Sequence, residues 1–183
     1  MFIQTEETPN PATMKFLPGR GVMPQGTLEI TSADMASASP LAETLFKISG
    51  VKGLFLGSDF ITVTKSADKD WLSLKPPILA AIMDHYTLNK PILAQEGDSA
   101  EEAHSEDDAV SAQIRELINL KVRPAVAQDG GDITFQRFED GVVYLNLRGS
   151  CAGCPSSTMT LKAGIENMLK HYIPEVREVR QSA

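Results

Sequence analysis

The stretch LRGSCAGCPSSTMTL, residues 147–161, holds both cysteines of the chain, Cys151 and Cys154. An alternating apolar run at 143–147 precedes it and predicts a strand. Pro155 follows the second cysteine directly, and proline is favoured at the first position of a helix, where its missing N–H costs nothing. We therefore expect a strand-to-helix turn with Cys154 against a helix N-terminus, where free amides and the helix dipole stabilise a thiolate.

Two thiols at this spacing support three kinds of chemistry besides inert thiols. An iron–sulfur cubane is normally held by four thiolates, so a chain with two would share the cluster with a second chain. A dithiol oxidoreductase uses one activated and one resolving thiol of a CxxC motif. A structural zinc ion also needs four ligands and hence a dimer, unless His171 or another residue contributes.

The residues around the motif favour the cluster over redox catalysis. The motif lies near the end of the chain, in a segment too short for the larger sheet that a dithiol oxidoreductase uses. Ala152 and Gly153 leave the sulfurs open on one side, as a shared or transferable cluster requires. No catalytic set accompanies the thiols, so we expect a binding protein rather than an enzyme.

The charge and hydropathy of the chain exclude two classes of partner. The net charge of -7 comes from residues 95–108, which carry seven acidic and no basic residues; the rest has 17 acidic against 17 Lys and Arg residues. Neither a basic stripe nor an aromatic platform is visible, so nucleic acid is not expected as a partner. No apolar run approaches the roughly 20 residues of a membrane span, so no membrane association is expected.

The compartment is inferred from the cysteines and from residues 1–11. This stretch lacks both the apolar core of a secretory signal and the Arg-rich character of a transit peptide. A CxxC motif without an export signal indicates a reducing compartment and free thiols. We expect a cytoplasmic bacterial protein, with the mitochondrial matrix as the alternative.

Residues 1–87 predict a first domain of order ββαββα. The strands are expected at 2–5, 14–17, 53–56 and 60–64, with one helix running from Pro40 to Gly50 and another from Trp71 to Met83. Pro76 and Pro77 should kink or split the second helix, because an interior proline costs about 3 kcal/mol. We interpret His85 as a partly packed surface residue. With no catalytic set, this domain is expected to dock clients or partners.

The rest of the chain predicts an acidic, flexible linker at 88–107 and a second domain at 108–183. A helix is expected from residue 109 to about 125, with Pro124 bending or tightening its last turns, followed by strands at 133–138 and 142–147 around a Glu139-Asp140-Gly141 turn. A second helix follows the CxxC motif, and a last short strand is expected at 175–180. The order αββα(β) gives, with the first domain, an α+β protein of two small layered domains.

Several motifs together resemble a known family. The sequences DGGD at 129–132, GSCAGCPSS at 149–157, TLK at 160–162 and GIE at 164–166 resemble the C-terminal domain of NifU. TPNP at 8–11 with Lys15-Phe16 is similar to the N-terminal domain of Nfu-type proteins. The resemblance covers nearly the whole chain except the linker, and the CxxC segment is its most specific part.

The resemblance implies a non-catalytic carrier in iron–sulfur protein maturation. Such proteins bind a 4Fe–4S cluster between the CxxC motifs of two subunits, receive it from upstream donors and pass it to apo iron–sulfur proteins. The implied ligands are Cys151 and Cys154, in a homodimer when loaded. The chain lacks the cysteine-bearing scaffold domain and the ferredoxin-like domain of full-length NifU, which implies a downstream carrier. The alternative function is a CxxC dithiol–disulfide oxidoreductase.

Overall fold

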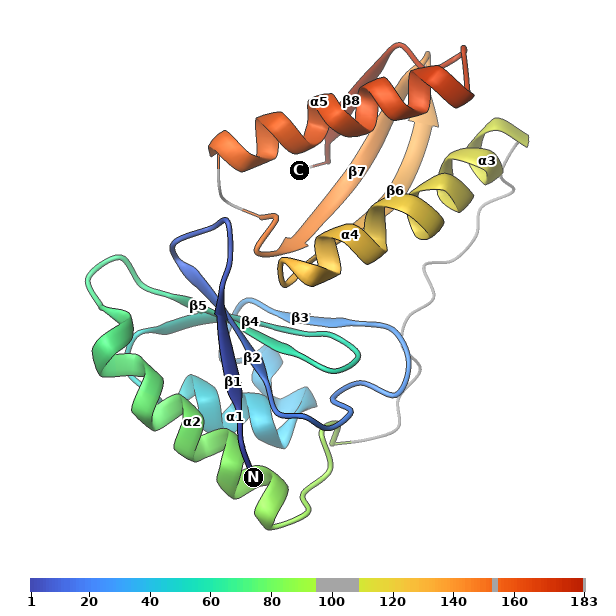
Figure 1. The fold of residues 1–183 in the computed structure, drawn as a ribbon. Helices are drawn as coiled ribbons and strands as arrows, with labels where there is room; N and C mark the ends of the chain where they lie inside the picture. Colours follow the sequence, from blue (N-terminus) through green and yellow to red (C-terminus); the bar gives the residue numbers. More distant parts are fainter. Residues whose placement is uncertain (95–108, 153–154, 183) are drawn as a thin grey trace. The chain divides into compact units, whose positions relative to one another are not determined.

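The computed structural model describes residues 1–94, 109–152 and 155–182, with only the backbone for 155–157. The chain forms two compact units, Met1–Ala100 and Glu101–Ala183 (Figure 1). Both units combine a β-sheet with helices, as the α+β prediction requires. Among the helices of the described residues, none has both the length and the apolar character that crossing a bilayer takes.

The first unit is an antiparallel sheet of five strands in the order β1-β2-β5-β4-β3. The strands are β1 (Gln4–Glu7), β2 (Thr13–Leu17), β3 (Leu28–Ile30), β4 (Val51–Leu56) and β5 (Ile61–Lys65). The helices are η1 (Met35–Ala38), α1 (Pro40–Phe46) and α2 (Trp71–Thr87), and in Figure 1 α1 and α2 lie on one side of the sheet.

Alternation along the strands builds the core of this unit. Met14 and Phe16 on β2 are buried toward the helices together with Ile61 and Val63 on β5. The period of two puts every second side chain of a strand on the same face. The sequence prediction lacked β3, because only three residues pair there, after a stretch rich in Gly and Pro.

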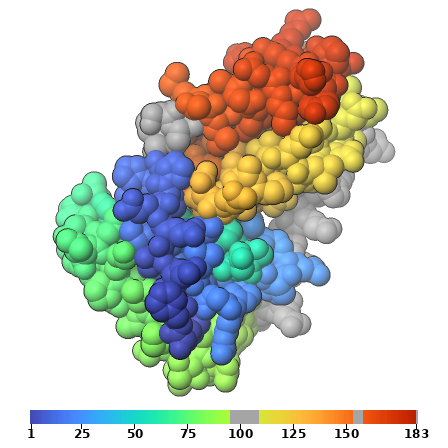
Figure 2. Space-filling model, in the orientation of Figure 1, coloured from blue at the N-terminus to red at the C-terminus, as the bar shows by residue number. Residues whose placement is uncertain are grey.

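Of the two effects expected from Pro76 and Pro77, a kink or a split, the split is wrong. Helix α2 runs without interruption through Pro76 and Pro77, and its outer side reaches the surface (green in Figure 2). The carbonyls that lose their N–H partners belong to Leu72 and Ser73, both exposed, so water can satisfy them. Asp70 accepts the Ser73 N–H at 2.8 Å and caps the start.

The interpretation of His85 as a surface residue is wrong. The side chain is only 3% exposed, because residues 78, 82 and 85 share the buried face of α2. Burial, with a smaller contribution from Lys90, lowers the pKa of His85 below its usual value of 6.5. Within the range predicted as linker, Ile92 and Leu93 pack against this core, and residues 95–107 lie outside the described residues.

The second unit has the predicted order αββα(β). Its helical elements are α3 (Ala109–Leu117), η2 (Ile118–Val122), α4 (Arg123–Gln128) and α5 (Pro155–Tyr172). Its sheet has the order β6-β7-β8, with β6 (Gly131–Glu139) antiparallel and β8 (Glu178–Gln181) parallel to β7 (Val142–Gly149). Helix α5 begins at Pro155, as predicted. Asp140 and Gly141, both at positive φ, make the hairpin turn, and a bulge shifts the β6–β7 register between Phe135 and Arg137.

The turn before Pro124 is widened rather than tightened. Segment η2 is a π-helix, and the Arg123 N–H bonds to the Ile118 carbonyl five residues back. Ile118, Val122 and Val126 still point into the core, where they meet residues of the sheet and of α5. A π-turn of this kind absorbs an irregularity inside a helical segment.

Replacing Phe16 by Ala should lower the free energy of unfolding of the first unit by about 3–5 kcal/mol, because the fully buried ring leaves a cavity. Trp71, the only tryptophan, lies on α2, so its fluorescence during urea unfolding reports on this unit. Leu72→Ala, at a side chain 87% exposed, is the matched control and should change the unfolding free energy little. Equal effects of the two substitutions would contradict the assigned core.

Candidate functional site

The end of β7 lies beside the start of β6, and this brings the cysteine segment to the start of β6. Gly131, the first residue of β6, pairs with Gly149, the last residue of β7. Gly149 has φ +63, a conformation that glycine adopts without strain, and the chain turns there toward Cys151. Cys151 therefore lies at the end of the sheet where β6 begins and β7 ends.

Gly131 leaves the space that the Cys151 sulfur occupies. A Cβ atom on residue 131 would overlap Cys151 Sγ and would lie 3.0 Å from both Cys151 N and Ser150 Oγ. A contact this close requires one of the partners to move, and here the backbone of Cys151 is among them. Position 131 therefore needs glycine as long as Cys151 keeps its place.

Hydrogen bonds on both sides hold the segment around Cys151. The Ser150 hydroxyl donates to the Asp129 carbonyl at 2.5 Å, and the Ser150 N–H donates to the Gly130 carbonyl at 3.3 Å. The Thr158 hydroxyl on α5 donates to the Cys151 carbonyl at 3.3 Å. Cys151 is thus tied to the loop before β6 on one side and to α5 on the other.

The surroundings of Cys151 favour its neutral thiol. The residue is 7% exposed, and burial, with the Asp129 carboxylate next in size, raises the pKa of the Cys151 thiol to about 12. A hydrogen bond with Ser150 opposes this shift, and Asp132 adds to it. In this state Cys151 is not an activated nucleophile. The expected thiolate at Cys154 lies outside the described residues.

An ion pair that the sequence did not reveal lies beside this loop. Arg123, the first residue of α4, donates from Nε to Asp132 Oδ1 at 2.8 Å and from Nη2 to Oδ2 at 2.9 Å. The Asp132 residue is 4% exposed. The sequence analysis identified Asp132 only as part of DGGD and gave Arg123 no role, since a pairing across nine residues leaves no periodic pattern.

His171 is too far along α5 to join Cys151 as a ligand in the same chain. It lies in the last turn of α5, whereas Cys151 precedes the first turn. At 1.5 Å per residue the helix separates His171 from Pro155 by roughly 24 Å. The zinc site with His171 that was left open is therefore excluded within one chain.

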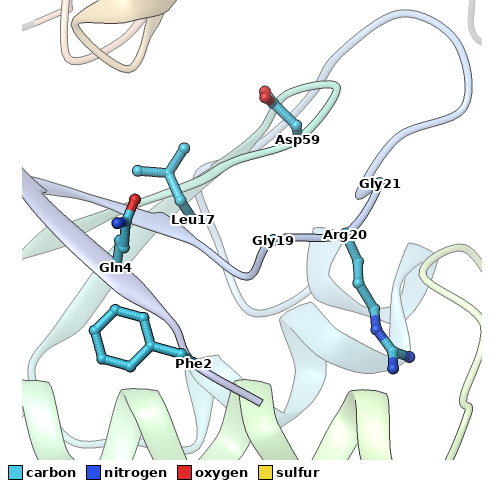
Figure 3. A pocket seen from close by; sticks show the side chains of 7 residues that line it. All are labelled: Phe2, Gln4, Leu17, Gly19, Arg20, Gly21 and Asp59. Atoms are coloured by element: carbon cyan, nitrogen blue, oxygen red, sulfur yellow. The ribbon is translucent and has the colours of Figure 1, made fainter.

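A pocket in the first unit differs from the cysteine site in the chemical groups that line it. Its volume is about 600 Å³, and its lining residues are Phe2, Gln4, Leu17, Gly19, Arg20, Gly21 and Asp59 (Figure 3). The Arg20 side chain points away from Asp59 in this view. The lining offers no cysteine or histidine, so the pocket lacks the soft ligands that iron–sulfur or zinc chemistry requires.

Cys151 should react slowly with iodoacetamide in a Cys154→Ala variant that carries no metal. With a pKa of about 12, the thiolate fraction at pH 8 is at least about a hundredfold below that of an ordinary cysteine, whose pKa is about 8.5. The alkylation rate should keep rising with pH toward 12, whereas an exposed thiol levels off above about pH 9. The urea-unfolded variant is the control and should show the ordinary profile; a plateau near pH 9 in the folded protein would contradict the assigned environment.

Comparisons with known proteins match both units. The family model described as "Scaffold protein Nfu/NifU N terminal" matches residues 3–89, and the model described as "NifU-like domain" matches residues 114–180. These two ranges contain strands β1 to β7 and all of β8 except its last residue. The second range also contains both cysteines.

Curated relatives match over 99% of the chain. The human protein named "NFU1 iron-sulfur cluster scaffold homolog, mitochondrial" is 51% identical over 182 residues, which make up 72% of its length. The "NifU-like protein 4, mitochondrial" of Arabidopsis thaliana is 49% identical over 186 residues, and 66% of its length is covered. The chain thus spans about two thirds to three quarters of these two proteins.

A solved structure of a NifU-like protein from Saccharomyces cerevisiae is 28% identical, with a TM-score of 0.47; the match covers 52% of this chain and 87% of the yeast chain. The two family models and the near full-length identity of 51% carry the assignment. The chain belongs to the Nfu/NifU family of scaffold proteins.

Proposed function

We propose that the protein carries an iron–sulfur cluster, binds it as a 4Fe–4S cargo between the CxxC motifs of two copies, and transfers it to apo iron–sulfur proteins. The observation that carries this proposal is the placement of Cys151 against Gly131, which leaves the sulfur without a competing side chain at the start of β6. The names of the relatives, which include an iron–sulfur cluster scaffold homolog, support the nature of the cargo.

The number of thiols argues for two copies. The sequence supplies Cys151 and Cys154 and no third cysteine, whereas a cubane cluster normally takes four thiolates. Two chains that meet through their second units provide four. In this arrangement Cys151 and Cys154 of each chain are the ligands, and the protein is a homodimer when it is loaded.

The neutral thiol of Cys151 suits a cargo that has to leave again. Thiolate ligation requires that the proton is lost, so the raised pKa of Cys151 opposes ligation and weakens the hold on the cluster. Incoming client thiolates can then replace the ligands one at a time. The same raised pKa disfavours the alternative function, a dithiol–disulfide oxidoreductase, at this cysteine, because that chemistry begins with an activated thiolate.

The first unit is proposed to hold partners, either apo-protein clients or upstream donors, while the second presents the cluster. Nothing in its pocket offers ligands for the cargo, which is consistent with a docking role. Tethering by the acidic linker would raise the effective concentration of cluster and client without further contacts. The relatives are named as mitochondrial, which supports the mitochondrial matrix over the bacterial cytoplasm as the location.

Changing Cys151 or Cys154 to Ala should abolish cluster binding, since each copy then offers only one thiolate. The fold should stay intact. Anaerobic reconstitution with iron and sulfide, followed by absorbance near about 400 nm and iron analysis, should give about four irons per pair of wild-type chains and almost none in either variant. Leu120→Ala, at a side chain of the second unit that is 67% exposed, is the control and should still bind. A variant that keeps a full cluster would refute the ligand assignment.

Removing residues 1–87 should slow cluster transfer to a client while the remaining chain still assembles a cluster. The client is an apo iron–sulfur enzyme whose activity reports the arrival of the cluster, and circular dichroism checks that the shortened chain is folded. If a folded fragment fails to assemble the cluster, or transfers it at the full-length rate, the proposed division of roles is wrong.

A further inference from the structure

We infer that Arg123 is a positioning residue for Cys151 and acts through Asp132 and Gly131. The inference rests on the proposed function in one respect: it takes Cys151 as a ligand whose place matters. The contacts that support it are those of Arg123 on α4 with Asp132 at the start of β6, and of Gly131 with the Cys151 sulfur. Each contact can be tested without a cluster.

The first step is the fixed orientation of the Asp132 carboxylate. Its two oxygens receive the two N–H donors of the Arg123 fork, at 2.8 and 2.9 Å, and Oδ1 also accepts the Ile133 N–H at 2.9 Å. The Asp132 side chain is 5% exposed, whereas that of Arg123 is 34% exposed. A planar fork with both donors engaged fixes direction as well as distance, which a single point charge does not.

The second step is the anchoring of Arg123 itself. Val122 and Val126, on either side of it along the helix, are buried in the core of the second unit. The π-turn ends where Arg123 donates its backbone N–H to Ile118, so the side chain leaves the helix at a defined place. The guanidinium thus connects α4, which Val126 anchors in the core, to Asp132, the second residue of β6.

The third step leads from Asp132 to the sulfur. Asp132 pairs with Arg148, and Gly131 beside it pairs with Gly149, so the start of β6 is held against the end of β7. The Gly131 backbone then lies directly against Cys151, close enough that no Cβ fits between them. Any displacement of the Asp132 backbone therefore reaches Cys151 through one residue.

A purely stabilising role would give a different pattern of effects. A buried ion pair adds little net stability compared with well-packed apolar residues, because both charges lose their hydration. Its distinguishing property is the orientation that it imposes on its neighbours. The test must therefore separate the access to Cys151 from the overall stability of the unit.

The experiment measures how fast a thiol reagent labels Cys151, at one fixed pH, in the metal-free Cys154→Ala protein. Arg123→Gln should raise the labelling rate about tenfold, since the start of β6 is no longer held and the sulfur becomes accessible. Arg123→Lys keeps the charge without the fork and should give an intermediate rate. An unchanged rate in Arg123→Gln overturns the inference.

Two control variants address stability and charge. Arg180→Gln removes a second forked pair of this unit, with Glu178 at 2.8 and 3.1 Å, and should leave the rate unchanged. Val179→Ala removes buried apolar atoms on β8 and destabilises the unit without touching the loop. If Val179→Ala accelerates labelling as much as Arg123→Gln at equal melting temperature, Arg123 is only structural and the inference fails.

A double-variant cycle tests the route through Gly131. As a single variant, Gly131→Ala should raise the labelling rate, because its Cβ displaces Cys151. If Arg123 acts through Gly131, the double variant labels about as fast as the faster single variant. Two effects that multiply are independent and overturn the route.

Should Arg123→Gln fail to fold, Asp132→Asn replaces it and keeps the side-chain volume. These measurements use metal-free protein, so failure of cluster binding would refute the proposed function and leave this result intact.

Discussion

The contact between Gly131 and Cys151 is the constraint on which the second unit depends. The Cys151 sulfur lies so close to the Gly131 backbone that a Cβ atom on residue 131 would not fit. This arrangement requires that β6 start, and β7 end, at the same level of the sheet, and the Gly131–Gly149 pair provides it. The hydrogen bonds of Ser150 then fix the turn that follows. Protein interiors are packed closely enough that such a contact determines position to a fraction of an ångström.

The environment of Cys151 balances two opposed requirements. A buried sulfur beside the Asp129 carboxylate is most stable as a neutral thiol, and this slows the reaction of Cys151 with disulfides or electrophiles. A bound soft cation reverses the preference, because it favours the thiolate over the proton. Under the proposed function, the burial that protects the Cys151 thiol also opposes tight retention of the cluster, which a carrier needs less than a protein with a resident cofactor does.

The sequence predicted those features that depend on local patterns. Alternating residues indicated β2 and β7, Pro155 predicted the start of α5, and the Asp140-Gly141 pair predicted the hairpin turn. Features that depend on distant partners were missed or misjudged. Strand β3 pairs through only three residues, and the burial of His85 depends on the elements packed over α2.

The same distinction applies to the candidate site. The CxxC spacing identified the cysteines, and the family resemblance identified the DGGD segment around Gly131. The pairing of Arg123 with Asp132 could not be read from the chain, because neither residue belongs to a helical or strand period and the pair depends on how α4 packs on the sheet. The raised pKa of Cys151 likewise comes from its burial in the folded unit. The helix dipole that the local sequence suggested concerns Cys154, which lies outside the described residues.

The bulge between Phe135 and Arg137 divides the β6–β7 hairpin into two lengths with separate registers. On one side lies the pairing that ends at Gly131 and Gly149, two residues before Cys151, and on the other lies the turn at Asp140. An insertion or deletion near the turn can be taken up at this irregularity before it reaches the site. The hairpin therefore tolerates changes of length at its turn while the Gly131–Gly149 end stays in register, so the turn can vary without changing the backbone geometry next to Cys151.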